Sequence, residues 1–342
     1  MRWRTGGRAC SKRTPAHKPI CGPSENDRAV AFLTLDAAEV VAVAAPDGAV
    51  VPLYSLAGPT QAPGLLVAHA NGFAAGSYGP WLHMFAERLR VFAYDARGHG
   101  GASWPKAPLD VVLHVDRFAD ELATVAAVVA SRLAGAPLYF IGHSLGAATF
   151  LRLATRGAAP AFAHAVLFEP PVFPSPSATH HAEAAAKQEP LIARSAQRRA
   201  HWESPEALYR LLKRRGMFQR FRPEMLAAHC RATLRPLPAG GYTLACPPAI
   251  ESSIFRSHRL ADTWDRLPSV NQPIHLVSSD ATAAERSWVS AVLPEMALRI
   301  PGASLDVLPG TGHMLIFEAP EACHDLALAR LGLAPSHARN AG

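Results

Sequence analysis

Residues 137–146 read PLYFIGHSLG, and this stretch decides the fold. An apolar run, PLYFIG (137–142), leads directly into GHSLG (142–146), and a helical apolar pattern continues over residues 145–154. Glycines on both sides of a serine permit a sharp, strained turn between a buried strand and a helix. The sequence therefore predicts that the Ser144 hydroxyl stands above the end of a strand, with the N-terminus of a helix behind it.

Strand and helix patterns alternate on both sides of this turn. Short apolar runs occur at 65–70, 91–96, 137–142, 165–168, 274–279 and 304–308. Helical spacing occurs around Leu82, Phe85 and Leu89, from Phe118 to Leu133, from Leu145 to Ala154, from Trp288 to Met296 and from Glu318 to Leu331. Buried strands joined by crossover helices predict an α/β fold with a mostly parallel, doubly wound sheet. Residues 39–57, with Asp47-Gly48 at their centre, predict an antiparallel hairpin that opens the fold.

The alternation stops after Pro170-Pro171 and resumes at the run 274–279. The segment between these points is polar, rich in arginine and helical in its apolar pattern. We therefore predict a mainly helical cap at 173–270, inserted after the sixth strand. The core then comprises residues 29–172 and 271–342. Residues 1–28 have seven Lys/Arg, two acids and no apolar periodicity, which predicts a disordered basic tail.

Charge is distributed unevenly along the chain. The predicted cap has 15 Lys/Arg against 8 Asp/Glu, a net +7, whereas the predicted core has 12 against 17, a net −5. A basic cap favours, as a hypothesis, a substrate that bears a carboxylate or another anionic group.

Other classes of protein are not indicated by the sequence. No apolar stretch approaches the ~18 residues of a membrane span, and the basic tail alone does not indicate a nucleic-acid partner. The five cysteines lack CxxC spacing, which predicts neither a zinc site nor a disulfide framework and fits a reducing cytoplasm. They are Cys10, Cys21, Cys230, Cys246 and Cys323. No metal or organic cofactor is predicted, and the oligomeric state is left open.

With these motifs the sequence resembles the α/β-hydrolase superfamily over residues 39–331, with the cap as the least similar part. The segment 69–73 (HANGF) resembles the family's HG-type loop, and 95–100 (DARGHG) resembles its architectural turn. The resemblance implies that Ser144 is a nucleophile. It also implies that the amides of Leu145 and Asn71 form an oxyanion hole, with Phe73 as the alternative because the loop has one residue more than usual. Arg97 and His99 would stabilise the turn.

A serine nucleophile needs a neighbouring base, and the chain has 16 histidines. His313 is favoured because it follows the last strand in a Gly-rich loop and lies C-terminal to Ser144, in the order this fold requires. His143 is expected to point away from Ser144. The pair His180-His181 is expected to be solvated rather than metal-bound.

The acid that would orient His313 has two candidates. Many family members place it after the seventh strand, but here Thr282 stands at the expected position, with Asp280 two residues before it. Glu169 ends the sixth strand, a placement that resembles some haloalkane dehalogenases. We favour Glu169 and keep Asp280 as the alternative. Because the nucleophile is Ser144 rather than an aspartate, dehalogenation is not expected.

The sequence thus predicts a serine hydrolase that cleaves an ester or related acyl bond of a small molecule through an acyl-enzyme. A carbon–carbon bond hydrolase or a cofactor-free perhydrolase would use the same residues on the same fold. The alternative from a different class is a hydrolase-like binding protein that retains its ligand without turning it over.

Overall fold

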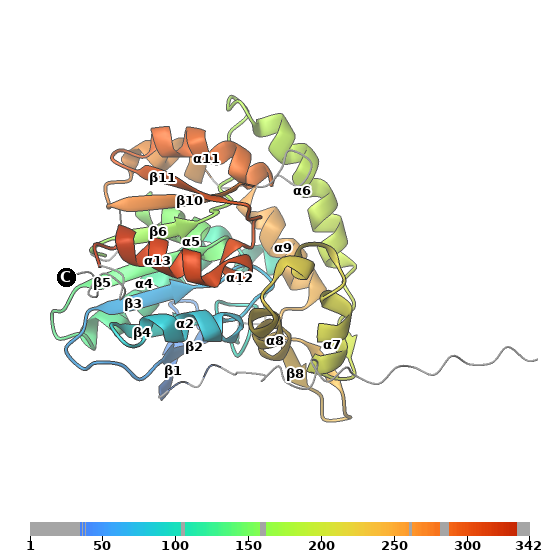
Figure 1. Cartoon of the computed structure of the whole chain (residues 1–342). Helices are drawn as coiled ribbons and strands as arrows, with labels where there is room; N and C mark the ends of the chain where they lie inside the picture. Colours follow the sequence, from blue (N-terminus) through green and yellow to red (C-terminus); the bar gives the residue numbers. More distant parts are fainter. Residues whose placement is uncertain are drawn as a thin grey trace, which may run out of the picture. The chain divides into compact units, whose positions relative to one another are not determined.

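An eight-stranded sheet organises the chain in the computed structural model (Figure 1). In spatial order its strands are β1 (Glu39–Ala44), β2 (Val50–Ser55), β4 (Arg90–Tyr94), β3 (Gly64–Ala68), β5 (Leu138–His143), β6 (Ala165–Phe168), β10 (Ile274–Asp280) and β11 (Ser304–Pro309). β1, β2 and β4 pair antiparallel, and every pair from β4 to β11 is parallel. The predicted α/β fold with a mostly parallel sheet is confirmed. The predicted hairpin is confirmed as well, and Gly48, at φ 84°, supplies the positive φ of its turn.

The structure describes residues 35, 37, 39–103, 107–157, 162–259, 262–280 and 287–333. The predicted tail at 1–28, with Cys10 and Cys21, and Thr282 lie outside the described residues. Among the described residues, no helix has the length and apolar character needed to cross a membrane.

Helices cover both faces of the sheet. On one face, α4 (Val115–Ser131), α5 (Leu145–Ala154) and α11 (Trp288–Arg299) pack on the strands, and on the other face lie α2 (Gly79–Phe85) and α13 (Pro320–Arg330). Shorter elements are η1 (Ala75–Tyr78), α3 (Leu109–Val112) and α12 (Leu315–Glu318). α2 ends at Phe85, so Leu89 lies outside the helix predicted for it, because the chain must already turn into β4 at Arg90. Leu89 is nevertheless buried.

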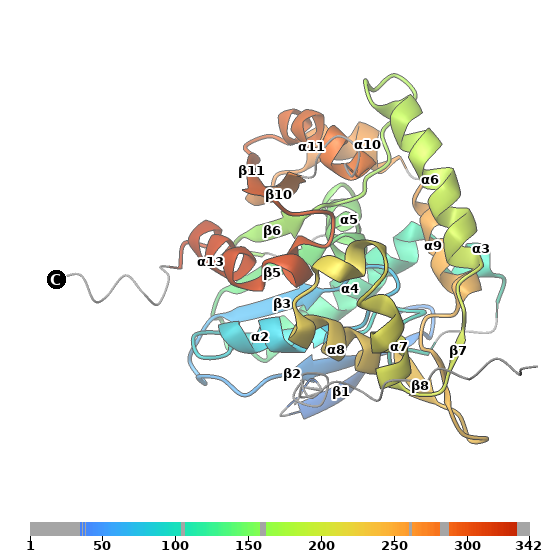
Figure 2. The same ribbon diagram turned by 45° about the vertical axis from the view of Figure 1, so that its right-hand side comes forward.

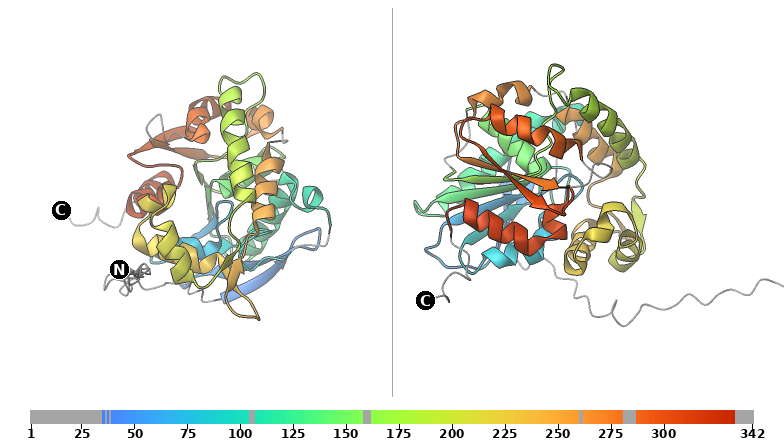
Figure 3. Two further views of the ribbon diagram at one scale, coloured as in Figure 1. Left: turned by 90° about the vertical axis from the view of Figure 1, so that its right-hand side faces the viewer. Right: turned by 45° about the horizontal axis from the view of Figure 1, so that its top comes forward.

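Between β6 and β10 the chain leaves the sheet (Figure 2). This segment contains α6 (His181–Ala196), α7 (Pro205–Leu212), η2 (Gly216–Arg220), α8 (Pro223–Ala232), α9 (Pro248–His258), α10 (Thr263–Arg266) and η3 (Leu267–Ser269). It also contains a small antiparallel sheet of β7 (His201–Trp202), β9 (Tyr242–Leu244) and β8 (Leu234–Pro236). Strands this short have no detectable periodicity, and the sequence analysis did not anticipate them. α6 and α9 lie side by side (Figure 3). The boundaries 173–270 stay a prediction.

A buried ion-pair network holds the turn after β4. Arg97 is fully buried, and its Nε lies 3.0 Å from the Glu121 carboxylate. Its terminal nitrogens lie 2.7 and 3.1 Å from the carboxylate of Asp47, in the β1–β2 hairpin. His99 donates from Nδ1 to the Arg97 carbonyl oxygen. These contacts fix the turn against both the hairpin and α4, which agrees with the stabilising role expected for Arg97 and His99.

We expect Arg97→Leu to lower the free energy of unfolding by about 3–5 kcal/mol, because it leaves the buried Glu121 carboxylate without its partner. The control is Arg132→Leu, since Arg132 pairs with Glu39 at an exposed site, where ion pairs contribute little. Urea unfolding of both variants measures the difference. Equal destabilisation by the two substitutions would contradict this view of the network.

Candidate active site

Ser144 stands at a strained turn between β5 and α5. Its backbone has φ 50° and ψ −112°, a region that costs a non-glycine residue on the order of 1–3 kcal/mol. The two flanking glycines make the turn possible. A Cβ at Gly142 would lie 2.6 Å from the Ala147 backbone, and a Cβ at Gly146 would overlap the Ala68 carbonyl oxygen in β3. The Ser144 amide donates to the Phe168 carbonyl oxygen at 2.9 Å, which ties the turn to β6.

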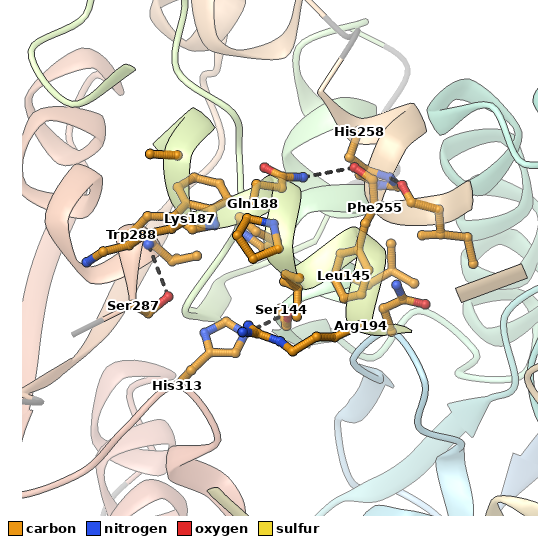
Figure 4. A pocket seen from close by; sticks show the side chains of 17 residues that line it. Ser144, Leu145, Lys187, Gln188, Arg194, Phe255, His258, Ser287, Trp288 and His313 are labelled. Carbon is orange, nitrogen blue, oxygen red and sulfur yellow. Dashed lines mark hydrogen bonds between the residues drawn. The ribbon is translucent and has the colours of Figure 1, made fainter. Parts of the chain in front are cut away.

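His313 bridges Ser144 and Glu169. It follows β11, and its Nε2 lies 3.0 Å from the Ser144 Oγ (Figure 4). Its Nδ1 lies 2.9 Å from Glu169 Oε2. Because a carboxylate only accepts hydrogen bonds, Nδ1 carries the proton. Nε2 can therefore accept a hydrogen bond from the Ser144 hydroxyl.

Glu169 is fully buried at the end of β6, and it also has a positive φ, 49°. Besides His313, its carboxylate accepts hydrogen bonds from the Ser279 amide at 2.6 Å and from the Ser290 hydroxyl at 3.1 Å. Burial raises the pKa of Glu169. The hydrogen bond and charge of His313, with the Ser279 and Ser290 donors, lower this pKa by more than burial raises it, so that it lies below the ordinary value and the group stays ionised.

The structure brings Glu169 to His313 and does not bring Asp280 there. Asp280 is exposed at the end of β10, where it faces Pro309 of β11 in the parallel register. Ser279 and Ser290, which donate to the Glu169 carboxylate, were not identified from the sequence. Ser279 could have been found as a strand-end residue, whereas Ser290, in α11, has no local signal.

The amides of Leu145 and Asn71 are available at the cavity that contains Ser144. Both residues line this cavity, and within the described part of the chain neither backbone N–H has a hydrogen-bond partner. The alternative donor, Phe73, is placed differently. Its amide donates to the Ala70 carbonyl oxygen at 3.1 Å, and its ring packs on Phe317, 4.9 Å between centroids. The extra residue of the loop is therefore part of a turn in which the Phe73 amide is already bonded. Asn71 remains the favoured second donor of the expected oxyanion hole.

The Asn71 loop is held from two sides. The Asn71 side-chain amide donates to the Glu251 carbonyl oxygen of α9 at 3.0 Å, and the Gly72 amide donates to His99 Nε2 at 2.9 Å. Burial first, and His69 second, lower the pKa of His99 well below its ordinary value, which keeps this imidazole neutral and able to accept. The loop thus has fixed anchors in both α9 and the turn after β4.

His143 connects three loops beneath the site. It points away from Ser144, and its Nε2 donates to the His313 carbonyl oxygen at 3.0 Å. Its Nδ1 accepts from the Tyr78 hydroxyl at 2.7 Å, and that hydroxyl accepts from the Ala70 amide at 3.1 Å. Burial, assisted by the neighbouring His313, lowers the pKa of His143 to about 3. A neutral His143 therefore couples the loops of Ser144, His313 and Ala70.

A second anchor holds the His313 loop. The Gly312 amide donates to the buried Glu318 carboxylate at 2.9 Å, and Arg220 Nε of η2 lies 2.8 Å from the same carboxylate. Arg220 also donates to the Gly310 carbonyl oxygen at the start of the loop. Neither Glu318 nor Arg220 was identified as an anchor from the sequence, and the partners of Arg220 lie far along the chain.

A cavity of about 430 Å³ opens above Ser144. Its floor contains Asn71, Ser144, Leu145 and His313. Its walls comprise Pro171, then Ala186, Lys187, Gln188, Pro190, Leu191 and Arg194 from α6, then Ile254, Phe255 and His258 from α9, and Ser287, Trp288 and Val289 around the start of α11. Within the described ranges, no group of three or more His, Cys, Asp or Glu is placed to hold a metal ion. His180 and His181 each bond locally, to Glu183 and to the Pro174 carbonyl oxygen.

The comparisons with known proteins identify the family and the fold. The sequence model of the alpha/beta hydrolase family matches residues 65–326, so the chain belongs to the α/β-hydrolase family. No curated protein sequence matches it. Among solved structures, E-2-(acetamidomethylene)succinate hydrolase is 19% identical, with a TM-score of 0.68 over 86% of this chain and 100% of that one.

Two further solved structures are similar. The thioesterase domain from the curacin biosynthetic pathway is 21% identical, with a TM-score of 0.65 over 85% of this chain and 99% of that one. A thermophilic esterase from Thermogutta terrifontis is 19% identical, with a TM-score of 0.60 over 86% of this chain and 98% of that one. At these identities the likeness shows the fold.

We predict that His143→Leu slows covalent labelling of Ser144 by a fluorophosphonate roughly 10-fold to 100-fold, because misplacement of His313 by about 1 Å is enough for such a loss. His143→Gln keeps a donor at the position of Nε2, so it should label faster than the leucine variant. His83→Leu, an exposed histidine of α2, is the control. Thermal unfolding shows whether each variant is folded. Equal labelling by the leucine and glutamine variants would argue against a positioning role.

Proposed function

We propose that the chain is a serine hydrolase that cleaves an ester or related acyl bond of a small molecule. The observation that carries this proposal is the continuous set of contacts from Ser144 Oγ to His313 Nε2, at 3.0 Å, and from His313 Nδ1 to Glu169, at 2.9 Å. These groups come from three separate strand ends and meet on the floor of a cavity. A structural serine would have no need of a histidine oriented by a buried carboxylate.

In the first half of the reaction, His313 accepts the Ser144 proton as the hydroxyl attacks the acyl carbonyl carbon. Negative charge then develops on the carbonyl oxygen, where the amides of Leu145 and Asn71 are free to donate. The N-terminus of α5 adds its dipole to the same place. Collapse of this intermediate expels the leaving group, which takes the proton from His313, and leaves the acyl group on Ser144.

In the second half, water attacks the acyl carbon of the acyl-enzyme as His313 takes its proton. The bond between this carbon and Ser144 Oγ then breaks, His313 returns the proton to Oγ, and the acid product leaves. The ionised Glu169 holds the imidazole in the productive tautomer and stabilises its cationic form. His143, with its pKa lowered to about 3, remains neutral and serves only to position the His313 backbone.

We further propose that residues 173–270 act as a cap that selects the substrate. α6 and α9 supply most of the wall above Ser144, and much of that wall is apolar. The similar structures bear the names of a hydrolase of an acetamido-substituted succinate, a thioesterase and an esterase. Those names differ although the fold is shared, which supports the proposal that the cap, rather than the fold, selects the substrate of this chain.

Ser144→Ala and His313→Ala should each reduce ester hydrolysis by on the order of 10⁴-fold to 10⁶-fold, because a nucleophile and its base act as a unit. Hydrolysis of para-nitrophenyl acetate is the measurement, with circular dichroism to show that both variants are folded. More than a tenth of the wild-type rate in either variant would rule out the assigned roles.

Glu169→Gln should lower kcat by roughly 10²-fold to 10⁴-fold with little change in KM, since it removes the negative charge that stabilises protonated His313. Asp280→Asn is the matched control, a strand-end acid converted to its amide, and should be mild. A larger loss of kcat in the Asp280 variant would reverse the assignment of the acid.

A further inference from the structure

The charged side chains that line the cavity are both cationic. Lys187 and Arg194 lie on α6, and among the described residues no aspartate or glutamate belongs to the lining. Both side chains are exposed, and most of the remaining wall is apolar. The cavity therefore favours a negative charge on its ligand.

The cavity faces one side of α6. Residues 187, 190, 191 and 194 all line it, and these positions follow the spacing of three and four that places side chains on one face of a helix. Arg194 thus belongs to the helix face that is turned toward Ser144. Figure 4 shows its side chain extending toward Ser144 and His313.

Arg194 differs from its neighbours in having no acidic partner among the described residues. Lys187 pairs with Glu183 at 2.8 Å, one turn earlier in α6. Other arginines of this segment also have carboxylate partners: Arg198 pairs with Glu251, Arg199 with Glu203, Arg220 with Glu318 and Arg259 with Glu189. Within the part of the chain that the structure describes, the Arg194 guanidinium makes no hydrogen bond or ion pair. Its donors are available to a ligand.

We propose that Arg194 is an anion subsite that binds a carboxylate carried by the substrate close to the scissile acyl bond. This inference rests on the proposed hydrolase function and specifies its substrate class. A guanidinium presents a planar pair of N–H donors that matches the two oxygens of a carboxylate. A single guanidinium suits a monoanionic carboxylate better than a phosphate dianion, whose additional charge would call for more cations. The apolar wall would contact the rest of the molecule.

The test compares two esters of similar length, para-nitrophenyl hydrogen succinate, which bears a carboxylate, and the neutral para-nitrophenyl pentanoate. For the wild-type protein we expect kcat/KM to be at least about tenfold higher with the succinate ester. Arg194→Gln should remove this preference, so that the ratio of kcat/KM for the succinate ester to that for the pentanoate ester falls to about one. Arg210→Gln is the matched control, because it removes an exposed cationic residue of α7 that does not line the cavity. It should keep the preference.

A binding measurement separates this proposal from the proposed function. Succinate itself should bind the wild-type protein and the Arg210 variant with the same Kd in calorimetric titration, and the Arg194 variant at least about tenfold more weakly. If Ser144 is not the nucleophile, neither ester is hydrolysed in a Ser144-dependent way, yet the titration still tests Arg194. Equal binding of succinate by wild type and Arg194→Gln, or a succinate preference that survives this substitution, would overturn the subsite.

Discussion

The close approach of α5 to β3 is the constraint on which the site depends. At Gly146 the helix lies so near the Ala68 carbonyl oxygen that no Cβ fits. The Gly146 amide donates to the His69 carbonyl oxygen at 3.1 Å. This contact joins the turn of Ser144 to the loop of Asn71. The strained backbone of Ser144 persists because the packed strands and helix around it leave it no alternative.

Parallel pairing then brings the other groups to the same place. β5, β6 and β11 all run in one direction, so their carboxyl ends meet at one edge of the sheet. Ser144, Glu169 and His313 each follow one of these ends, although His313 is 169 residues from Ser144 in the sequence. The strands, together with the anchored loop of His313, therefore set the distances on which proton transfer depends.

Two buried titratable groups near one another, Glu169 and His143, have different charges because their partners differ. Glu169 is surrounded by donors, and its pKa falls below the ordinary value despite burial. His143 lies between the Tyr78 hydroxyl and the His313 carbonyl oxygen, which a neutral imidazole satisfies, and its pKa falls to about 3. The site thus keeps one negative charge beside His313 and no competing positive charge beneath it.

The sequence by itself determined the alternation of strands and helices, the turn at Ser144 and the shortlist of strand-end residues that contains Glu169 and His313. Such features depend on neighbours along the chain, which apolar periodicity and glycine spacing report directly. Only the tertiary structure decided that Glu169 rather than Asp280 contacts His313. It also decided that the Phe73 amide has a hydrogen-bond partner, whereas the Asn71 amide has none among the described residues. It alone placed Arg194 at the cavity, where no carboxylate of the described part of the chain pairs with it. These outcomes depend on strand register and on the direction of each side chain across the sheet edge, and distances between residues far apart in the chain leave no trace in local sequence.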